Sequence, residues 1–477
     1  RTAYNSFNYS PVFDEEHRIV GFPEMDDIDG SEINYSALGG TGKSVSKMSS
    51  FFANASYSYL DKYILTGALR YDGSDIIGND NQFTPLWNVG LRWNLHREEF
   101  MKRWMWVDQF AVRGGFGYTG SIDKNALPFV VMTLGQSVIY DGQTVPTSFS
   151  YPNPNVKWQT KQDMNVGLDL SLFDYRLELG VNYYNNITRD VLDRKALPYS
   201  SGRSEVTENV ADIYNSGWEI DLGVTLLKNK SFQWYAKANI AINDNKVKNT
   251  YYKDTKDLPK ATLSNAHQFV ENQPVNGWYG YKFAGINPIN GAVMTYTGNG
   301  EATLDMSVSG ATWPIPSVFY LGNLTPPVVG GFSTSANWKQ LIFSANFEFK
   351  TGHKIKSFNT FRSLDARNRH TSEANRWREP GDITNVPAMS EAFTTYSSYM
   401  YDILLEKGNY LRCSYMTLGY NLKPEWLHKI GFSTARLSFT AKDLFTVSSY
   451  SGIDPALMGS FGYPNSRKYT ITLNVGF

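Results

Sequence analysis

One stretch of the chain has the residue types and spacing of a phosphate-binding loop. Residues 37–44 read Ala-Leu-Gly-Gly-Thr-Gly-Lys-Ser, which fits the P-loop pattern except that Ala37 takes the place of the first glycine. In a P-loop, backbone N–H groups and the N-terminus of a following helix surround the phosphate, so a buried strand must precede the loop and a helix must follow it. Here a polar segment precedes the stretch and a strand-like segment follows it. We therefore interpret residues 37–44 as a flexible loop.

Two further sets of residues have metal-ligand chemistry. Residues 24–32 gather carboxylates, and Asp27, Asp29 and Gly30 resemble part of an EF-hand loop, but the remaining acidic ligands are out of register. The histidines are scattered, without the close pairs that zinc sites use. They are His17, His96, His267, His353, His370 and His428. We predict a solvated loop at residues 24–32, and neither a metal nor another cofactor.

No arrangement of a nucleophile with a base is visible, and the sequence has no Gly-x-Ser-x-Gly motif. The single cysteine, Cys413, excludes an internal disulfide framework and lies in a strand-like pattern, where we expect it to be a small packing residue. Lys plus Arg and Asp plus Glu number 45 each, so the chain has no basic surplus for nucleic acid. The sequence predicts a protein that is not an enzyme.

The end of the chain shows which elements dominate. In residues 467–477, Tyr469, Ile471, Leu473, Val475 and Phe477 alternate with polar residues or glycine, so a strand there has one apolar face. The pattern recurs about fifteen times. It is clear at 51–59, 63–71, 87–95, 110–118, 164–170, 177–183, 218–226, 234–242, 343–349, 416–422, 437–441 and 469–477, and weaker near 277–286, 292–297 and 329–338.

Composition and connection lengths favour a membrane barrel over a soluble sandwich. The chain is 15% aromatic with a mean hydropathy of −0.38, and no run of about 18 apolar residues is present, which excludes a helical membrane protein. Short turns near residues 60, 173, 229 and 339 alternate with long polar segments at 73–83, 120–156, 188–213, 246–276, 298–328, 352–408 and 446–466. Outer-membrane barrels have short periplasmic turns and long outer loops, which places the C-terminus in the periplasm.

Several segments, in order along the chain, resemble SusC/RagA-type TonB-dependent outer-membrane transporters of Bacteroidetes. These are residues 61–74 with Gly78, 153–160 with 165–169, 408–412 with 417–420, 451–455, and 463–467. The resemblance covers about residues 47 to 477. Asp75-Ile76-Ile77 and Lys442-Asp443 depart from the family pattern, which affects ligand detail rather than fold.

The resemblance implies an all-β fold, a transmembrane antiparallel barrel of about 22 strands around a plug, of which this chain holds about fifteen. It also implies import of a large nutrient, an oligosaccharide or next a peptide, with a SusD-like surface lipoprotein as lid and with energy from the TonB complex. On this reading residues 1–46 are an outer loop region after a preceding strand and residues 47–477 are barrel strands. The chain starts at Arg1 without a signal peptide, so we expect it to be the C-terminal portion of a longer polypeptide.

Two groups of residues are candidates for function. Aromatic residues outside the clear strands offer faces on which sugars stack, although packing and interfacial roles are alternatives; they are Trp278, Tyr279, Tyr281, Trp313 and Trp377. Polar residues on the inward faces of strands are predicted to line the lumen; they are Arg92, Arg113, Asp169, Glu178, Glu219, Asp221, Lys237 and Glu348. A structural or adhesive barrel and a siderophore- or cobalamin-type receptor remain alternatives.

Overall fold

The structure is a computed structural model of the 477-residue chain. It describes residues 2–4, 12–13, 19–21, 43–45, 47–75, 77, 82–121, 132–140, 143–149, 157–196, 200, 205–255, 269–302, 318–357, 374–388, 400–427, 431–458 and 462–477. The acidic stretch 24–32, Trp313, and His17, His267, His370 and His428 lie outside these residues.

Strands dominate the described chain, and thirteen of them form one sheet. Its neighbours are all antiparallel where the register is resolved, and they follow each other in chain order, apart from strands that belong to the connections. The strands are β5 (Met48–Tyr59), β6 (Tyr63–Ser74), β7 (Phe83–Asn94), β8 (Val107–Ser121), β11 (Gln159–Leu172), β12 (Leu177–Ala196), β13 (Glu205–Lys228), β14 (Phe232–Lys248), β19 (Val328–Trp338), β20 (Leu341–Thr351), β23 (Tyr410–Asn421), β24 (Thr434–Ser448) and β25 (Lys468–Gly476). The predicted antiparallel all-β fold is confirmed.

The register places apolar residues opposite apolar residues on one face. Between β24 and β25, Leu437 pairs with Leu473 and Phe439 with Ile471. These side chains are exposed, although each is large and apolar. Cross-strand apolar pairs stabilise a sheet, but a broad exposed apolar face is unfavourable in water. The face therefore fits contact with lipid.

Two of the predicted strands lie outside the sheet, because they belong to the long connections. Residues 277–286 hold β15 (Gly277–Gly280), which pairs with β18 (Phe319–Asn323), and β16 (Phe283–Ile286), which pairs with β17 (Val293–Thr295). A further pair is β21 (Lys354–Lys356) with β22 (Leu405–Lys407). Alternation alone cannot tell such short strands from those of the main sheet.

The long loop predicted at 188–213 is wrong, because β12 and β13 extend through most of it as paired strands. They hold 20 and 24 residues. A membrane strand needs only about 9–11 residues to cross a bilayer. Beyond that length the sheet no longer has to present an apolar face to lipid, so the alternation is lost while backbone pairing continues. At this end Val191, Ala211 and Val247 form a buried apolar cluster.

The described residues form two compact units. The first comprises Arg1–Ala53, Leu69–Leu86 and Ile122–Trp158, and the second comprises Asn54–Ala68, Trp87–Ser121 and Gln159–Phe477. The first includes the short pairs β1 (Thr2–Tyr4) with β4 (Lys43–Val45), β2 (Val12–Phe13) with β3 (Ile19–Gly21), and β9 (Met132–Tyr140) with β10 (Gln143–Phe149). Lys43 and Ser44 of the stretch that resembles a P-loop thus lie in a strand rather than at a helix start. Within the residues described, no helix has the length and apolar character to cross a membrane.

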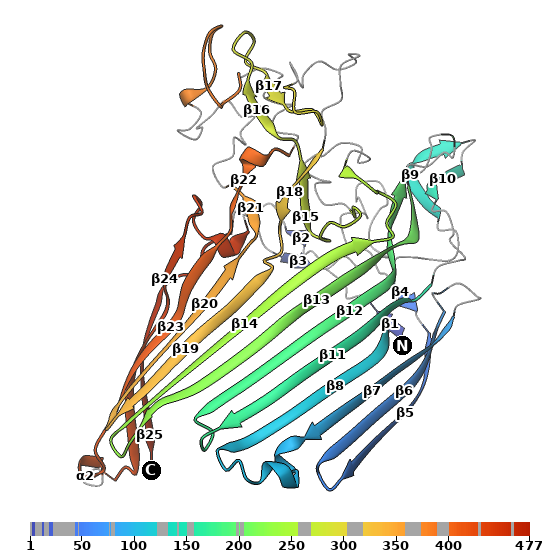
Figure 1. Ribbon diagram of the computed structural model, residues 1–477. Coiled ribbons are helices and arrows are strands. Elements are labelled where there is room, and N and C mark those ends of the chain that lie inside the picture. Colours follow the sequence, from blue (N-terminus) through green and yellow to red (C-terminus); the bar gives the residue numbers. More distant parts are fainter. Residues whose placement is uncertain are drawn as a thin grey trace. The chain divides into compact units, whose positions relative to one another are not determined.

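Figure 1 shows the strands from β11 to β25 side by side, with short connections at one end and long connections at the other, as the sequence predicts. The short turns use strained backbone at non-glycine residues: φ is 52° at Leu60, 53° at Asp61, 60° at Phe173 and 53° at Lys339. Left-handed turns match the twist of the strands that they join. The longer connections at this end contain η3 (Leu95–Arg97), η4 (Glu99–Met101) and α2 (Pro424–Leu427).

Glu98 holds the turn between β5 and β6 to the connection after β7. Its carboxylate accepts hydrogen bonds from the Tyr63 hydroxyl at 2.7 Å, Lys62 Nζ at 3.0 Å and Trp93 Nε1 at 3.1 Å. These bonds, in that order of importance, lower the pKa of Glu98 to about 2. Nearby, Arg97 Nη1 donates to Asp61 Oδ2 at 2.8 Å.

We expect the contribution of Glu98 to stability to depend on pH. Since its folded-state pKa lies below the ordinary value of 4.5, the carboxylate stabilises the fold fully above about pH 4.5 and loses this effect as the pH falls towards 2. Glu98→Gln should therefore lower the urea midpoint of the full-length protein at pH 7 and have little effect near pH 2. The matched control is Glu99→Gln, because the one ion pair of Glu99 among the described residues is with the exposed Lys102. Equal effects of Glu98→Gln at both pH values would contradict the assignment.

Candidate functional site

The polar face of β7, β8 and β11 carries two arginines around one carboxylate. Arg92 and Arg113 lie directly opposite each other on neighbouring strands, where like charges repel. Asp169 offsets the repulsion: its Oδ2 lies 2.9 Å from Arg92 Nη1 and its Oδ1 lies 3.5 Å from Arg113 Nε. Arg92 Nε also donates to Asn94 Oδ1 at 2.9 Å. The cluster keeps one positive charge in excess and is partly exposed.

A hollow of about 450 Å³ lies beside this cluster. Its polar lining includes Thr66, Asn88, Asn165, Asp163 and Thr119, and glycines form much of its floor. The glycines let neighbouring side chains lie flat on the sheet. A Cβ at 115 would lie 2.8 Å from Asn165 Oδ1, and a Cβ at 167 would lie 2.7 Å from Arg113 Nε. The hollow is therefore lined by few bulky side chains at its floor and offers amide and hydroxyl groups to a bound molecule.

The eight residues predicted to line the lumen share the polar face, as the register shows. The structure brings some of them together: Arg92, Arg113 and Asp169 form the cluster above, and Lys237 Nζ lies 4.0 Å from Asp221 Oδ1. Glu219 Oε2 accepts from Asn182 at 3.2 Å. Among the described residues Glu178 forms no ion pair with the other seven, and Glu348 belongs to the network around Arg412 described below. That this face lines the lumen of a closed barrel stays a prediction.

The aromatic residues predicted to bind sugar occupy a different environment. Trp278, Tyr279 and Tyr281 are only 5%, 0% and 3% exposed. Trp278 packs in one apolar cluster of the long connections, and Tyr279 and Tyr281 pack in another. Trp278 Nε1 donates to Lys354 O at 2.9 Å. Protein covers their rings, and these three side chains pack the connections, which supports the alternative that the sequence left open. That they bind a ligand stays a prediction.

Trp377 is half-buried and also belongs to this packing. Its Nε1 donates to Pro288 O at 3.1 Å, and its backbone N–H donates to Val386 O at 3.0 Å. Trp377 thereby ties two loop segments together, although part of its ring stays accessible.

His353 is buried, and its burial, with the nearby Lys350, lowers the pKa of the imidazole. Within the described part of the chain, no group of three or more His, Cys, Asp or Glu residues could hold a metal ion.

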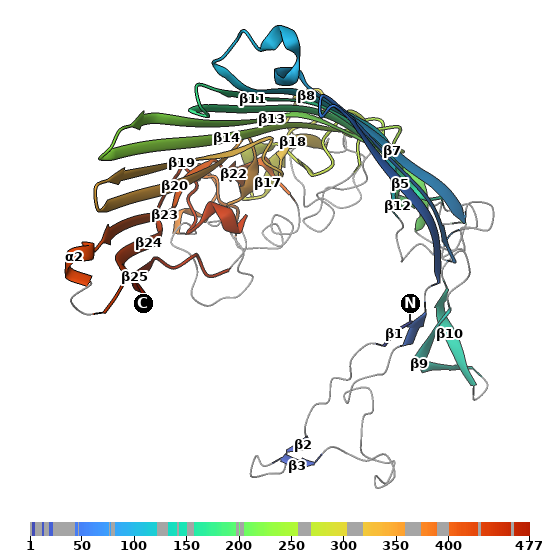
Figure 2. The same cartoon turned by 90° about the horizontal axis from the view of Figure 1, so that it is seen from below.

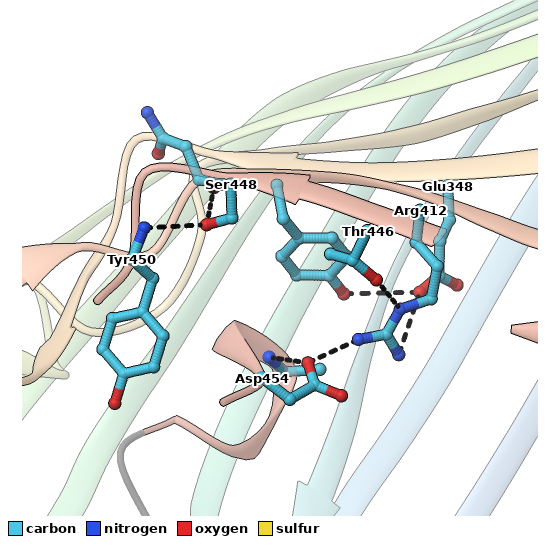
Figure 3. A network of polar contacts seen from close by, with 9 residues as sticks. Glu348, Arg412, Thr446, Ser448, Tyr450 and Asp454 are labelled. Atoms are coloured by element: carbon cyan, nitrogen blue, oxygen red, sulfur yellow. Dashed lines mark hydrogen bonds and ion pairs between the residues drawn. The ribbon is translucent and has the colours of Figure 1, made fainter. Parts of the chain in front are cut away.

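A buried ion pair joins the connection before β25 to the sheet (Figure 3). Arg412 of β23 and Asp454, at 5% and 8% exposed, place Nη2 and Oδ1 2.5 Å apart. Arg412 Nε also donates to Thr446 Oγ1 at 3.1 Å, and Arg412 Nη1 lies 4.0 Å from Glu348 Oε1. Asp454 Oδ1 accepts from Ala456 N at 2.9 Å, which caps η10 (Pro455–Leu457). The pair thus fixes this connection on the polar face.

The same connection is held at two more points. Ser451 donates from its backbone N–H to Glu406 Oε2 at 2.8 Å and from its hydroxyl to Glu406 Oε1 at 2.6 Å. The Tyr450 hydroxyl donates to Lys356 O at 3.0 Å. Arg412 and Asp454 were absent from the predicted site residues, although both stand in segments that carry the family resemblance. The resemblance of these segments could have pointed to Arg412 and Asp454, but their pairing depends on tertiary structure. Cys413, next to Arg412, is fully buried, as expected of a packing residue.

These features define the class of membrane barrel proteins. The antiparallel sheet has an apolar face that suits lipid, a polar face, and ordered connections at one end, as the wall of such a barrel does. Residues 2–349 match the family described as TonB dependent receptor-like, beta-barrel. The match covers well over half of the chain, so the chain belongs to this family.

Curated relatives and solved structures agree with this membership. The chain is 29% identical over 465 residues to TonB-dependent receptor P3 of Formosa agariphila, covering 90% of this chain and 45% of the relative. It is 23% identical to TonB-dependent receptor SusC of Bacteroides thetaiotaomicron, covering 90% and 43%. A RagAB peptide transporter structure superposes with a TM-score of 0.75 at 25% identity, covering 94% of this chain and 50% of that one. The chain spans about half the length of the relatives that it matches.

We expect Asp454→Asn to release the connection before β25. Removing one partner leaves the buried Arg412 guanidinium without its close carboxylate, which costs about 3 kcal/mol, at the low end for buried pairs because Glu348 lies nearby. The urea midpoint of the full-length protein should fall, and limited proteolysis should cut within residues 449–467. Glu425→Gln is the control, since it removes an exposed carboxylate from α2. Unchanged proteolysis of the Asp454→Asn variant would show that the pair does not hold the connection.

Proposed function

We propose that this chain forms barrel wall and outer connections of a TonB-dependent importer of a large nutrient in the outer membrane. The observation that carries the proposal is the two-faced antiparallel sheet of a chain that belongs to the TonB-dependent receptor family. Large barrels with polar interiors let large polar solutes pass, whereas an apolar outer face seats them in lipid. The protein binds and translocates its ligand without changing it.

The connection lengths support an orientation. With the short turns in the periplasm, the long connections, including the cores around Trp278 and Tyr279, stand outside the cell. The polar face then lines the lumen and places the eight charged residues, including Arg92 and Glu348, along the route of the ligand. Their mixed signs favour a wet wall rather than a site for one strongly charged solute.

An oligosaccharide is the ligand class that we favour. The hollow near Arg113 presents Asn88, Asn165 and Thr66, whose amide and hydroxyl groups can donate and accept, as sugar hydroxyls do. A peptide is the second candidate, because a structure with the same fold is described as a peptide transporter. Peptide groups also pair with amides, so the lining alone does not separate the two classes.

Two partners complete the proposal. A SusD-like surface lipoprotein would close over the long connections, which form a prepared platform because they have apolar cores of their own. The TonB complex would supply energy through N-terminal parts of the full-length protein. This partnership follows from the likeness to SusC and to RagAB.

Uptake by living cells tests the proposal. Deleting the gene should abolish uptake of a labelled oligosaccharide pool, and deleting tonB should abolish the same uptake, while entry of a small porin-permeable sugar stays unchanged. Loss of labelled peptide uptake instead would select the second ligand class. Full uptake of every ligand after gene deletion would favour a structural barrel, and selective loss of iron chelates would favour a siderophore receptor.

We further expect Asn88→Ala with Asn165→Ala to weaken ligand capture in the full-length transporter. Each lost hydrogen bond is worth about 1 kcal/mol, so the two changes should raise the ligand concentration for half-maximal uptake by about 5- to 30-fold. Asn239→Ala, on the same face but outside the hollow, is the matched control. An unchanged half-maximal concentration would remove the hollow from the ligand's route.

A further inference from the structure

The connection between β7 and β8 exposes an unusual run of residues. Lys102, Arg103, Trp104, Met105 and Trp106 are consecutive and all exposed, and Met105 is 89% exposed. Phe100, earlier in the connection, and Phe173, in the turn after β11, are exposed as well. We call Phe100, Trp104, Met105, Trp106 and Phe173 the aromatic lip. So many large apolar side chains in water would be unfavourable, which points to a non-aqueous neighbour.

The aromatic lip is an ordered structure. Backbone hydrogen bonds run from Trp104 N to Met101 O at 2.8 Å, from Val107 N to Trp104 O at 2.9 Å, and from Phe173 N to Trp106 O at 2.9 Å. The rings of Trp104 and Trp106 stack at 6.1 Å, and those of Trp106 and Phe173 at 5.7 Å. The lip is therefore already ordered, so contact with a neighbouring molecule costs little conformational entropy.

Its position makes it continuous with the apolar face. Trp106 lies directly before the first residue of β8 and Phe173 directly after the last residue of β11, at the end of the sheet with short turns. Figure 2 shows the segment with η3 and η4 on the convex side of these strands, whereas β18 and β22 lie on the concave side. In a barrel the convex side of the wall is the one that faces lipid. The aromatic lip thus lies at the edge of the lipid-facing surface.

The charges beside it are complementary to phosphate. In the connection, Glu98 pairs with Lys62, Glu99 pairs with Lys102, and Arg97 pairs with Asp61. Arg103 has no ion pair among the described residues, and it stands between Lys102 and Trp104. Tryptophan and tyrosine favour the membrane interface, and long basic side chains reach from there to head-group phosphates.

We propose that the aromatic lip inserts into the phospholipid leaflet at the short-turn end, and that Arg103, with Lys102 beside it, binds a head-group phosphate of an anionic phospholipid. The inference rests on the proposed membrane location. It adds a lipid-binding site that would fix the depth and tilt of the barrel wall while the ligand passes. A protein partner is the competing occupant, and the test below separates it.

Spin labels on the full-length protein in vesicles test the insertion. Vesicles of phosphatidylcholine with phosphatidylglycerol would hold the protein in a Cys413→Ala background with no other cysteine. A label at Met105→Cys should meet oxygen more often than a water-soluble nickel chelate, like a label at Val166→Cys on the apolar face of β11. A label at Tyr463→Cys, which is 99% exposed in the connection before β25, should show the opposite ratio.

The outcomes are distinguishable. If Val166→Cys reports lipid and Met105→Cys reports water, the barrel stands and the inserted lip is refuted, which leaves a protein partner. If Val166→Cys also reports water, the proposed membrane barrel itself fails.

The phosphate site is tested by the preference for spin-labelled phosphatidylglycerol over phosphatidylcholine. Arg103→Gln should lower that preference about fivefold at the site, the effect of one basic residue near an anionic surface, and Arg378→Gln should not. An unchanged preference in Arg103→Gln would overturn the phosphate site.

Discussion

Backbone pairing in a medium without water is the constraint on which the rest of this structure depends. Lipid offers no donors or acceptors, so each strand that crosses the bilayer must satisfy its N–H and C=O groups with two neighbouring strands. Antiparallel pairing of consecutive strands does this with the shortest connections. Once the strands are ordered in this way, the two faces and the two ends of the sheet follow. One face meets lipid, the other meets water, and the connections divide into short and long.

The two ends of the sheet use different means of stabilisation. At the short-turn end, left-handed residues such as Leu60 and Lys339 close the turns, and single polar side chains such as Glu98 hold neighbouring turns together. At the other end, the connections are long enough to build apolar cores around Trp278 and Tyr279 and to carry the buried pair of Arg412 and Asp454. Each end is therefore ordered without depending on residues inside the bilayer.

The sequence predicted the elements that the bilayer imposes and missed those that tertiary structure imposes. Each of the twelve clear alternating segments matches a sheet strand to within one residue at its end, because lipid on one side and water on the other leave a period-two pattern. The extension of β12 towards Ala196 was missed, because apolar and polar residues do not alternate there. The strand at 277–280 was assigned to the barrel, because a short buried strand in a connection has the same pattern.

The candidate site shows the same division. Strand parity alone placed Arg92, Arg113 and Asp169 on one face, but only the register brings them into one cluster. Aromatic residues outside the strands were taken as ligand-binding candidates, and Tyr279 and Tyr281 proved to be buried. An aromatic side chain in a long connection has two uses, to pack that connection or to bind, and composition does not separate them. Burial is the observation that bears on this choice: protein packs around Trp278, whereas the amides of the hollow and the rings of the aromatic lip are exposed and can contact other molecules.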